Sequence, residues 1–307
     1  MVKKIMSSLL AVLCTGVLSC GIVSAQTTQK HLNSASGFDS VVASGDFDLT
    51  FRYNEKCSVD WTVDEALADY VEVYVRGSSL NFAYNSKNLP KEIKNLYKGK
   101  NARKAVFRAI IYGPSLSSIT LTDNTSLDAS GATITTESFG LDLSANAKVN
   151  NLSVSAQRAT VTMSKNSTAV LDFGADEISL NLKEKAVVNL KHDSDRMDII
   201  ADGNSSVKAQ GDTKDAVVTL TKNAKATILG NAETLTTNTS NNSEFDGVAF
   251  RVNSASVVAN NSDVYVNAAD SLALDIKSGA KIYFMENPSV KIVGVTSSTI
   301  LPFSGVK

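Results

Sequence analysis

Apolar and polar side chains alternate on both sides of a residue that recurs along the C-terminal two thirds of the chain. Around Lys185, for example, Leu180, Leu182, Val188 and Leu190 are apolar, and the residues between them are mostly polar. Side chains of a β-strand point alternately to opposite faces, so this period of two predicts a short strand before and after the recurring residue. The recurring residues are Asn124, Asn146, Asn166, Lys185, Asn204, Asn223, Asn242, Asn261 and Gly279.

The recurrence predicts a repeat of about 19 residues. Successive numbers in that series differ by 22, 20, 19, 19, 19, 19, 19 and 18. The positions three and five residues before and after each recurring residue are apolar, except for Asn151, Thr237, Thr239, Gly247 and Ser256. A unit of strand, bend, strand and return loop cannot bury its apolar side chains alone, so successive units must stack into a solenoid.

The bend itself has a characteristic composition. Asparagine tolerates the left-handed backbone conformation of a sharp turn, so we expect a structural turn at Asn124, Asn146, Asn166, Asn204, Asn223, Asn242 and Asn261. The next residue is always Ala, Ser or Thr, and a small side chain there allows a tight corner. We therefore predict an all-β chain, a right-handed parallel β-helix of about nine 19-residue coils over residues 116–292, with a C-terminal cap at 293–307.

Residues 37–115 do not follow the repeat. They contain strand-like runs, and a short helix is expected at 64–70 with Asp64 as its N-cap. The open end of a solenoid exposes strand edges and core side chains, so a divergent terminal segment is expected to cover it. We interpret residues 37–115 as an N-terminal cap continuous with the solenoid.

Residues 1–25 have the features of a secretory signal peptide. Lys3 and Lys4 precede an apolar run that is too short to span a bilayer, and Val23-Ser24-Ala25 suits cleavage. Residues 26–36 would then form a flexible tail. Cleavage before Cys20, with lipid attachment there, is the less favoured alternative. Both interpretations export the chain to the periplasm, the cell surface or the medium, with no transmembrane span after signal removal.

Several short motifs resemble one known family. Phe38-Asp39-Ser40-Val41, Ser44-Gly45-Asp46-Phe47-Asp48-Leu49 and the passage from Asp64 to Val73 are similar to the opening of the putative auto-transporter adhesin, head GIN domain family. Tyr112-Gly113-Pro114-Ser115-Leu116 resembles that family's passage into its repeats. The resemblance covers about residues 38–290. It implies an exported bacterial β-helix, of the kind found in Bacteroidetes, that acts as an adhesin and has no catalytic residues to transfer.

One segment between residues 87 and 108 is strongly basic, with eight Lys or Arg residues against Glu92 alone. A solvated loop with a short amphipathic helix is one interpretation. The other is a binding site for an anionic glycan or phosphate surface, because clustered cations raise local affinity. The candidate ligand-binding residues are Lys91, Lys94, Tyr97, Lys98 and Lys100, with Tyr97 placed to stack on a sugar.

Composition narrows the function classes. The net charge of −1 gives no global attraction to nucleic acid. The only histidines are His31, in the expected tail, and His192, in the polar run His192-Asp193-Ser194-Asp195, which is interpreted as a loop. We therefore expect no cofactor, no metal and no catalytic site. Cys57, the only cysteine after signal removal, is expected to be buried and inert.

The leading hypothesis is a non-enzymatic exported module that displays polar β-helix faces to a glycan, matrix or protein partner. The alternatives are a polysaccharide-active β-helix enzyme and a purely structural envelope protein. The outward positions before each bend are rich in Ser, Thr and Asn, which fits either a solvated face or a carbohydrate-binding one. The sequence leaves the oligomeric state open.

Overall fold

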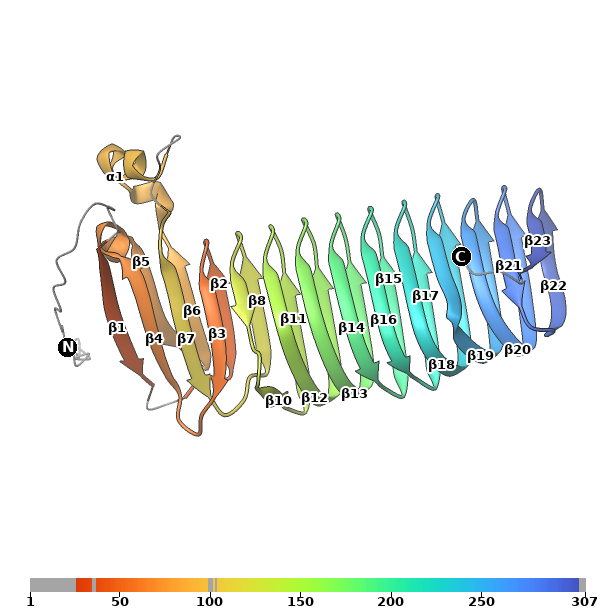
Figure 1. Ribbon diagram of the computed structural model, residues 1–307, viewed down its shortest axis with the longest axis horizontal. Helices are drawn as coiled ribbons and strands as arrows, with labels where there is room; N and C mark the ends of the chain where they lie inside the picture. The colour runs from red at the N-terminus through yellow and green to blue at the C-terminus, as the bar shows by residue number, and fades with distance from the viewer. Residues whose placement is uncertain (1–25, 35–36, 99–101, 103, 304–307) are drawn as a thin grey trace, which may run out of the picture.

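The chain forms a long β-solenoid in the computed structural model, which describes residues 26–34, 37–98, 102 and 104–303. The predicted signal peptide, including Cys20, and the candidate Lys100 lie outside these residues. Strands make up 67% of the structure and helices 6%, in about ten turns spaced by about 19 residues. The predicted all-β solenoid is therefore confirmed (Figure 1).

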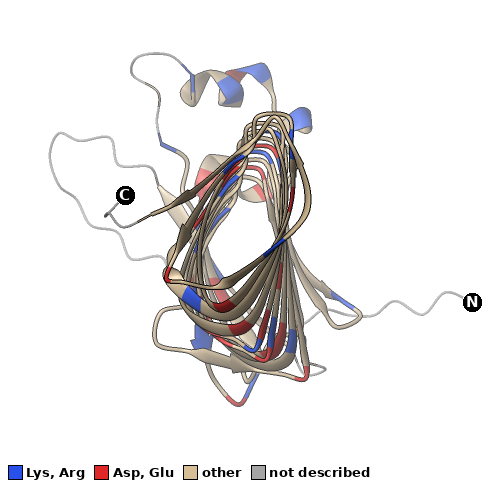
Figure 2. Cartoon of the chain, turned by 90° about the vertical axis from the view of Figure 1, so that its right-hand side faces the viewer, with Lys and Arg blue, Asp and Glu red and all other residues tan. Residues whose placement is uncertain are grey.

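Two parallel sheets face each other across the core, as the end-on view in Figure 2 shows. The strands that lead into the bends form sheet 1, which is parallel throughout except at its N-terminal end. Its separate strands are β2 (Ser40–Ser44), β6 (Ser79–Tyr84), β8 (Ser118–Thr122), β11 (Ser138–Leu143), β15 (Arg196–Ala201), β17 (Asp215–Leu220) and β22 (Ser289–Thr296).

The strands that leave the bends form sheet 2. Its separate strands are β3 (Asp48–Tyr53), β7 (Phe107–Gly113), β9 (Ser126–Asp128), β10 (Thr133–Thr135), β14 (Val187–Asp193), β16 (Ser206–Asp212), β21 (Lys281–Met285) and β23 (Thr299–Pro302). Five longer strands belong to both sheets, namely β12 (Lys148–Met163), β13 (Thr168–Leu182), β18 (Lys225–Ser240), β19 (Glu244–Asn260) and β20 (Asp263–Lys277). In these coils the expected return loop is instead continuous strand, which we call the far edge.

The opposite edge, which we call the turn edge, is a row of two-residue turns. In most coils the recurring residue and the one before it both have positive φ, as at Glu184 (52°) and Lys185 (67°). The amide of the following residue donates to the carbonyl before the pair, as in Ala186 N to Lys183 O at 3.2 Å. These features define a type I′ turn, whose twist matches that of the flanking strands. The seven asparagines at this position have φ between 48° and 65°.

The turns are bonded to one another along the solenoid. The amide of Asn146 donates to the carbonyl of Lys165 at 2.9 Å, and the amide of Asn223 donates to that of Asn241 at 3.0 Å. Side chains add a partial ladder, in which Asn146 Nδ2 donates to Asn124 Oδ1 at 3.0 Å. The small residue after each turn is buried, and the Ser205 and Ser243 hydroxyls donate to carbonyls of the preceding coil.

The polar exceptions to the apolar pattern have separate structural causes. Thr237 and Thr239 point inward and are buried. Asn151, with φ of 52°, is an extra residue in β12, and Leu152 takes the inward position. Gly247 leaves room for the Phe245 ring, which would lie 2.7 Å from a Cβ there.

The assignment of Ser256 and Val258 as inward-facing is wrong. An irregularity in β19 shifts the register by one residue, so that Val257 and Ala259 are buried and Val258 is exposed. The turn at Asn261 then has one residue fewer than its neighbours and restores the register at Ser262. The spacing of the recurring residues hides these two compensating changes.

The N-terminal end is closed by strands that run against the stack. β4 (Ser58–Asp64) is antiparallel to β7, β1 (Thr27–Asn33) is antiparallel to β4, and β5 (Val71–Arg76) is antiparallel to β6. The expected helix is a 3-10 helix, η1 (Glu65–Tyr70), with the Asp64 carboxylate accepting from the Ala66 amide at 3.2 Å. Val59, Val63 and Leu67 are buried there, which gives a capped end.

Two predicted boundaries differ from the structure. Residues 27–33 of the expected flexible tail form β1, because their amides and carbonyls pair with β4. At the C-terminus, parallel stacking continues past residue 292, since β22 pairs with β20 and β23 pairs with β21. The segment expected as a C-terminal cap at 293–307 thus begins with part of another coil.

Candidate binding surface at the insertion between β6 and β7

The basic segment is an insertion on the turn edge. β6 pairs with β2 and β7 pairs with β3, and β2 and β3 are joined by a short turn through Asp46. Where that turn would recur, the described residues 85–98, 102 and 104–106 leave the solenoid. They include the short 3-10 helix η2 (Ser86–Asn88) and α1 (Lys91–Leu96), which project beyond the row of turns (Figure 1).

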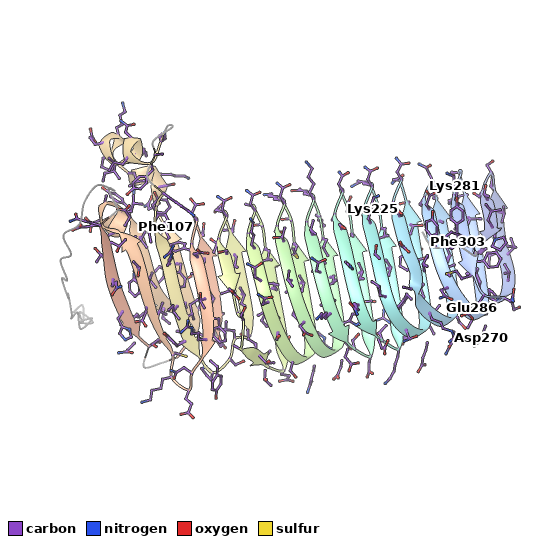
Figure 3. The ribbon with its side chains drawn as sticks, viewed as in Figure 1. Phe107, Lys225, Asp270, Lys281, Glu286 and Phe303 are labelled. Carbon is purple, nitrogen blue, oxygen red and sulfur yellow. The ribbon has the colours of Figure 1, made fainter. Side chains whose placement is uncertain are left out.

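An apolar base holds the insertion against the capped end. Leu89 is buried, and Ile93 and Tyr97 pack one helical turn apart against the core. Beneath them the Phe107 ring lies 4.7 Å from that of Tyr84 and 5.4 Å from that of Phe47, centroid to centroid. Burial raises the pKa of Tyr84. Figure 3 marks Phe107 at this base.

The predicted binding residues are divided by this packing. Lys91 and Lys98 are exposed, and Lys94 is half-buried, with its Nζ donating to the Lys87 carbonyl at 3.3 Å. Tyr97 contacts the core, so its ring supports α1. The structure therefore brings Lys87, Lys91, Lys94 and Lys98 together on one short segment.

Most lysines in the described part of the insertion form no ion pair with an acidic side chain. Within the described residues, Lys87, Lys91 and Lys98 form no ion pair, whereas Lys214, Lys222 and Lys225 on the solenoid pair with Asp195, Asp202 and Glu244 at 2.7–3.0 Å. Residues 85–108 hold eight basic side chains and one acidic side chain, a formal charge of +7, and the whole chain carries −1. The rest of the chain therefore carries a formal charge of −8, and the positive charge is concentrated in the insertion beside the capped end.

A cleft of about 400 Å³ lies where the insertion returns to the solenoid. Lys104 and Arg108 line it from the insertion and β7, and Asp46, Asp48, Asn124 and Ser126 line it from the turn edge. Asn124 Nδ2 donates to Asp46 Oδ1 at 2.8 Å, and the Ser126 hydroxyl donates to Asp48. The two basic residues belong to the basic segment seen in the sequence, but the sequence did not reveal the acidic and amide side chains opposite them, because residues 46 and 124 are brought together only by coil stacking.

Neither histidine lies at this surface. His31, placed in a tail by the sequence, lies on β1 and bonds to Asp60 (Nδ1 to Oδ1, 2.5 Å) and Asn33. The hydrogen bond to Asp60 is the main cause that raises the pKa of His31 above 6.5. The resulting stabilisation is complete below pH 6.5 and disappears as the pH rises through the raised pKa; it is small, because both side chains are about half exposed.

The run from His192 to Asp195 is only partly the expected loop. His192 lies on β14 with its ring buried in the core, and its Nδ1 is 3.3 Å from the Ser194 hydroxyl. Burial lowers the pKa of His192. Among the described residues, no three His, Cys, Asp or Glu side chains are grouped so that they could hold a metal ion.

Cys57, the free cysteine of the described chain, is half-buried against the core, so the expectation of a buried thiol is only partly met. Its Sγ lies 3.6 Å from the Phe38 carbonyl oxygen. No helix in the described part of the chain has the length and apolar character needed to cross a membrane.

These features define a parallel β-solenoid with one capped end and a basic insertion beside the cap. The sequence matches the family model described as "Putative auto-transporter adhesin, head GIN domain" over residues 37–192 and again over residues 175–288. The chain belongs to this family. The two overlapping matches cover most of the solenoid, and membership suggests a binding role.

Solved structures of bacterial proteins share the fold. A putative adhesin from Parabacteroides merdae has a TM-score of 0.53 at 14% identity, covering 91% of this chain and 97% of its own. A putative adhesin from Parabacteroides distasonis has a TM-score of 0.53 at 15% identity, covering 91% of this chain and 98% of its own. No curated protein matches the sequence.

Proposed function

We propose that the protein is an exported, non-enzymatic binding module that attaches to an anionic polysaccharide through the basic insertion. The observation that carries this proposal is the group of uncompensated lysines on a segment that stands clear of the solenoid. The predicted signal peptide and the adhesin family support export and a role at the envelope, the cell surface or the matrix.

Electrostatics explain why such a segment suits a polymer of repeated negative charge. Exposed charges act over a Debye length of about 8–10 Å at physiological salt, so Lys87, Lys91 and Lys98 present a combined field to several carboxylate or sulfate groups. The insertion leaves the solenoid on the turn edge. A flexible polymer can therefore approach it without contacting the acidic remainder of the chain.

The first experiment measures binding to polygalacturonate, chondroitin sulfate and neutral dextran. We expect binding to the two anionic polymers, weakened by about tenfold or more when the NaCl concentration is raised from roughly 0.05 M to roughly 0.3 M. The quadruple variant K91Q/K94Q/K98Q/K100Q should lose this binding. Its free energy of unfolding should stay within about 1 kcal/mol of the parent, because Lys91 and Lys98 are exposed and Lys94 makes a single hydrogen bond to a backbone carbonyl.

A matched control removes the same charge elsewhere. Lys148, Lys165, Lys208 and Lys281 are exposed on the solenoid, and K148Q/K165Q/K208Q/K281Q should bind like the parent. Equal loss in both variants would show that net charge, and not the insertion, is responsible. Binding to dextran that ignores salt would instead assign recognition to the Ser- and Thr-rich sheet faces.

The same mixtures distinguish the enzymatic alternative. A binding module leaves each polysaccharide intact, so no new reducing ends or unsaturated products should accumulate over a long incubation, with or without calcium. Reproducible release of either product would replace the proposal with polysaccharide cleavage.

A further inference from the structure

The two ends of the solenoid differ in how their core is covered. At the capped end, Val59, Val63 and Leu67 are at most 1% exposed. At the other end, Val290, Ile292 and Val295 of β22 are 40–49% exposed, although they stack directly on Leu272, Leu274 and Ile276, which are at most 1% exposed. The last coil therefore leaves the inward-facing core column uncovered, and we call β22 and β23 the open end.

The open end also has free backbone edges. In the described chain, β22 pairs only with β20, and β23 pairs only with β21. Their outer amides and carbonyls point along the solenoid axis, away from the stack. Unpaired edges beside exposed apolar side chains form a surface that readily accepts another strand.

We propose that the open end is the interface of a dimer in which two copies of this chain join end to end. A two-fold axis perpendicular to both sheets and passing through the middle of β22 brings β22 antiparallel against β22 of the second copy. This isologous contact covers the apolar column of each copy with that of the other and closes the assembly at two.

Two features favour a second copy as the occupant. Joining an open end to a capped end would place β22 and β23, of eight and four residues, against β5 and β1, of six and seven residues, so the strand lengths do not match. Only Lys291 is charged on β22 and β23, so two open ends meet with little repulsion.

The available area fits a modest interface. Eight strand residues at about 3.3 Å each give a length of about 26 Å, and two sheets about 10 Å apart, with about 5 Å of outer side chains on each, give a width of about 20 Å. The end therefore covers roughly 500 Å² at most. Two such ends bury roughly 1,000 Å² in total, which is near the lower limit for a specific interface. We therefore expect a reversible dimer.

The first test is sedimentation velocity on the chain without its signal peptide, from about 1 to about 100 μM, where an interface of this size should associate measurably. We expect the parent to shift from monomer to dimer across this range. The I292K variant should remain monomeric over the range. The matched control is I200K, which adds the same charge at a 50% exposed position on the outside of β15, and it should dimerise like the parent.

The I292K substitution could also unfold the last coil, which would prevent dimerisation for a different reason. A cross-linking test that leaves Ile292 in place separates the two explanations. In a C57A background, V293C places a thiol near the middle of β22, and V170C places one at an exposed position on β13 in mid-solenoid. Under oxidation V293C should form a disulfide-linked dimer at least about tenfold faster than V170C. A parent that sediments as a monomer throughout, or equal rates for the two cysteines, would overturn the proposal.

Discussion

The asparagines of the turn edge combine two roles in one side chain. Each occupies a left-handed position of its turn, and some also bond to the asparagine of the neighbouring coil, as Asn261 Nδ2 does to Asn242 Oδ1 at 2.9 Å. The backbone requirement applies in every coil, whereas the side-chain bond does not. Lys185 and Gly279 also adopt positive φ at this position, although neither has a side-chain amide.

Substitution of Asn223 separates the two roles. Asn223 has φ of 65°, so N223V puts a β-branched residue in the left-handed region and should lower the free energy of unfolding by about 1–3 kcal/mol. N223G, which removes the amide but tolerates positive φ, should cost less than about 1 kcal/mol. Urea denaturation of the two variants provides the measurement, and equal losses would contradict the turn's backbone requirement.

The buried His192 predicts how stability depends on pH. Burial lowers the pKa of His192 in the folded chain. Below about pH 6.5 this imidazole is therefore protonated in the unfolded chain but still neutral in the folded chain. The free energy of unfolding should therefore fall as the pH drops from 6.5 towards the lowered pKa. His192 stacks beside Phe173, so H192F fits the column and should flatten this part of the profile. An unchanged slope in H192F would assign the acid sensitivity to other groups.

At the scale of single elements, the coil is the unit that the sequence specifies. Period-two alternation and a left-handed residue every 19 positions determined the strands, the turns and the inward column of most coils. The same signal failed at Ser256, where an extra residue in β19 is offset by a shorter turn. Two compensating changes leave the repeat length unaltered, so spacing alone cannot reveal them.

Removal of one whole coil tests this unit directly. Deletion of residues 186–204 joins Lys185 to Ser205, so that one buried small residue replaces another in the same column. The shortened chain should fold with a cooperative transition and native-like circular dichroism. Deletion of residues 186–203 stops one position short of a full coil and leaves Asn204 where a buried small residue is needed. That chain should be destabilised by several kcal/mol or fail to fold.

At the scale of the whole molecule, the sequence predicted the stack but not the order of coils at its N-terminus. β6 and β7 lie outside β2 and β3, although they follow them in the chain. Nothing local encodes this crossover, because it depends on pairings between strands far apart in the sequence, such as β2 with β8 and β3 with β9. For the same reason the basic run was visible in the sequence, but its position on the turn edge and the cleft beneath it were not.

The difference between the capped and open ends also makes the unfolding of the rod directional. An interior coil must break contacts with two neighbours to open, whereas the last coil must break contacts with only one. Local opening therefore begins at β22 and β23 and proceeds inward, while the capped end resists it. Amide hydrogens should exchange with solvent in a gradient along the rod, fastest in the last coil. A partner bound at the open end would remove that gradient, and the solenoid would then be protected evenly from end to end.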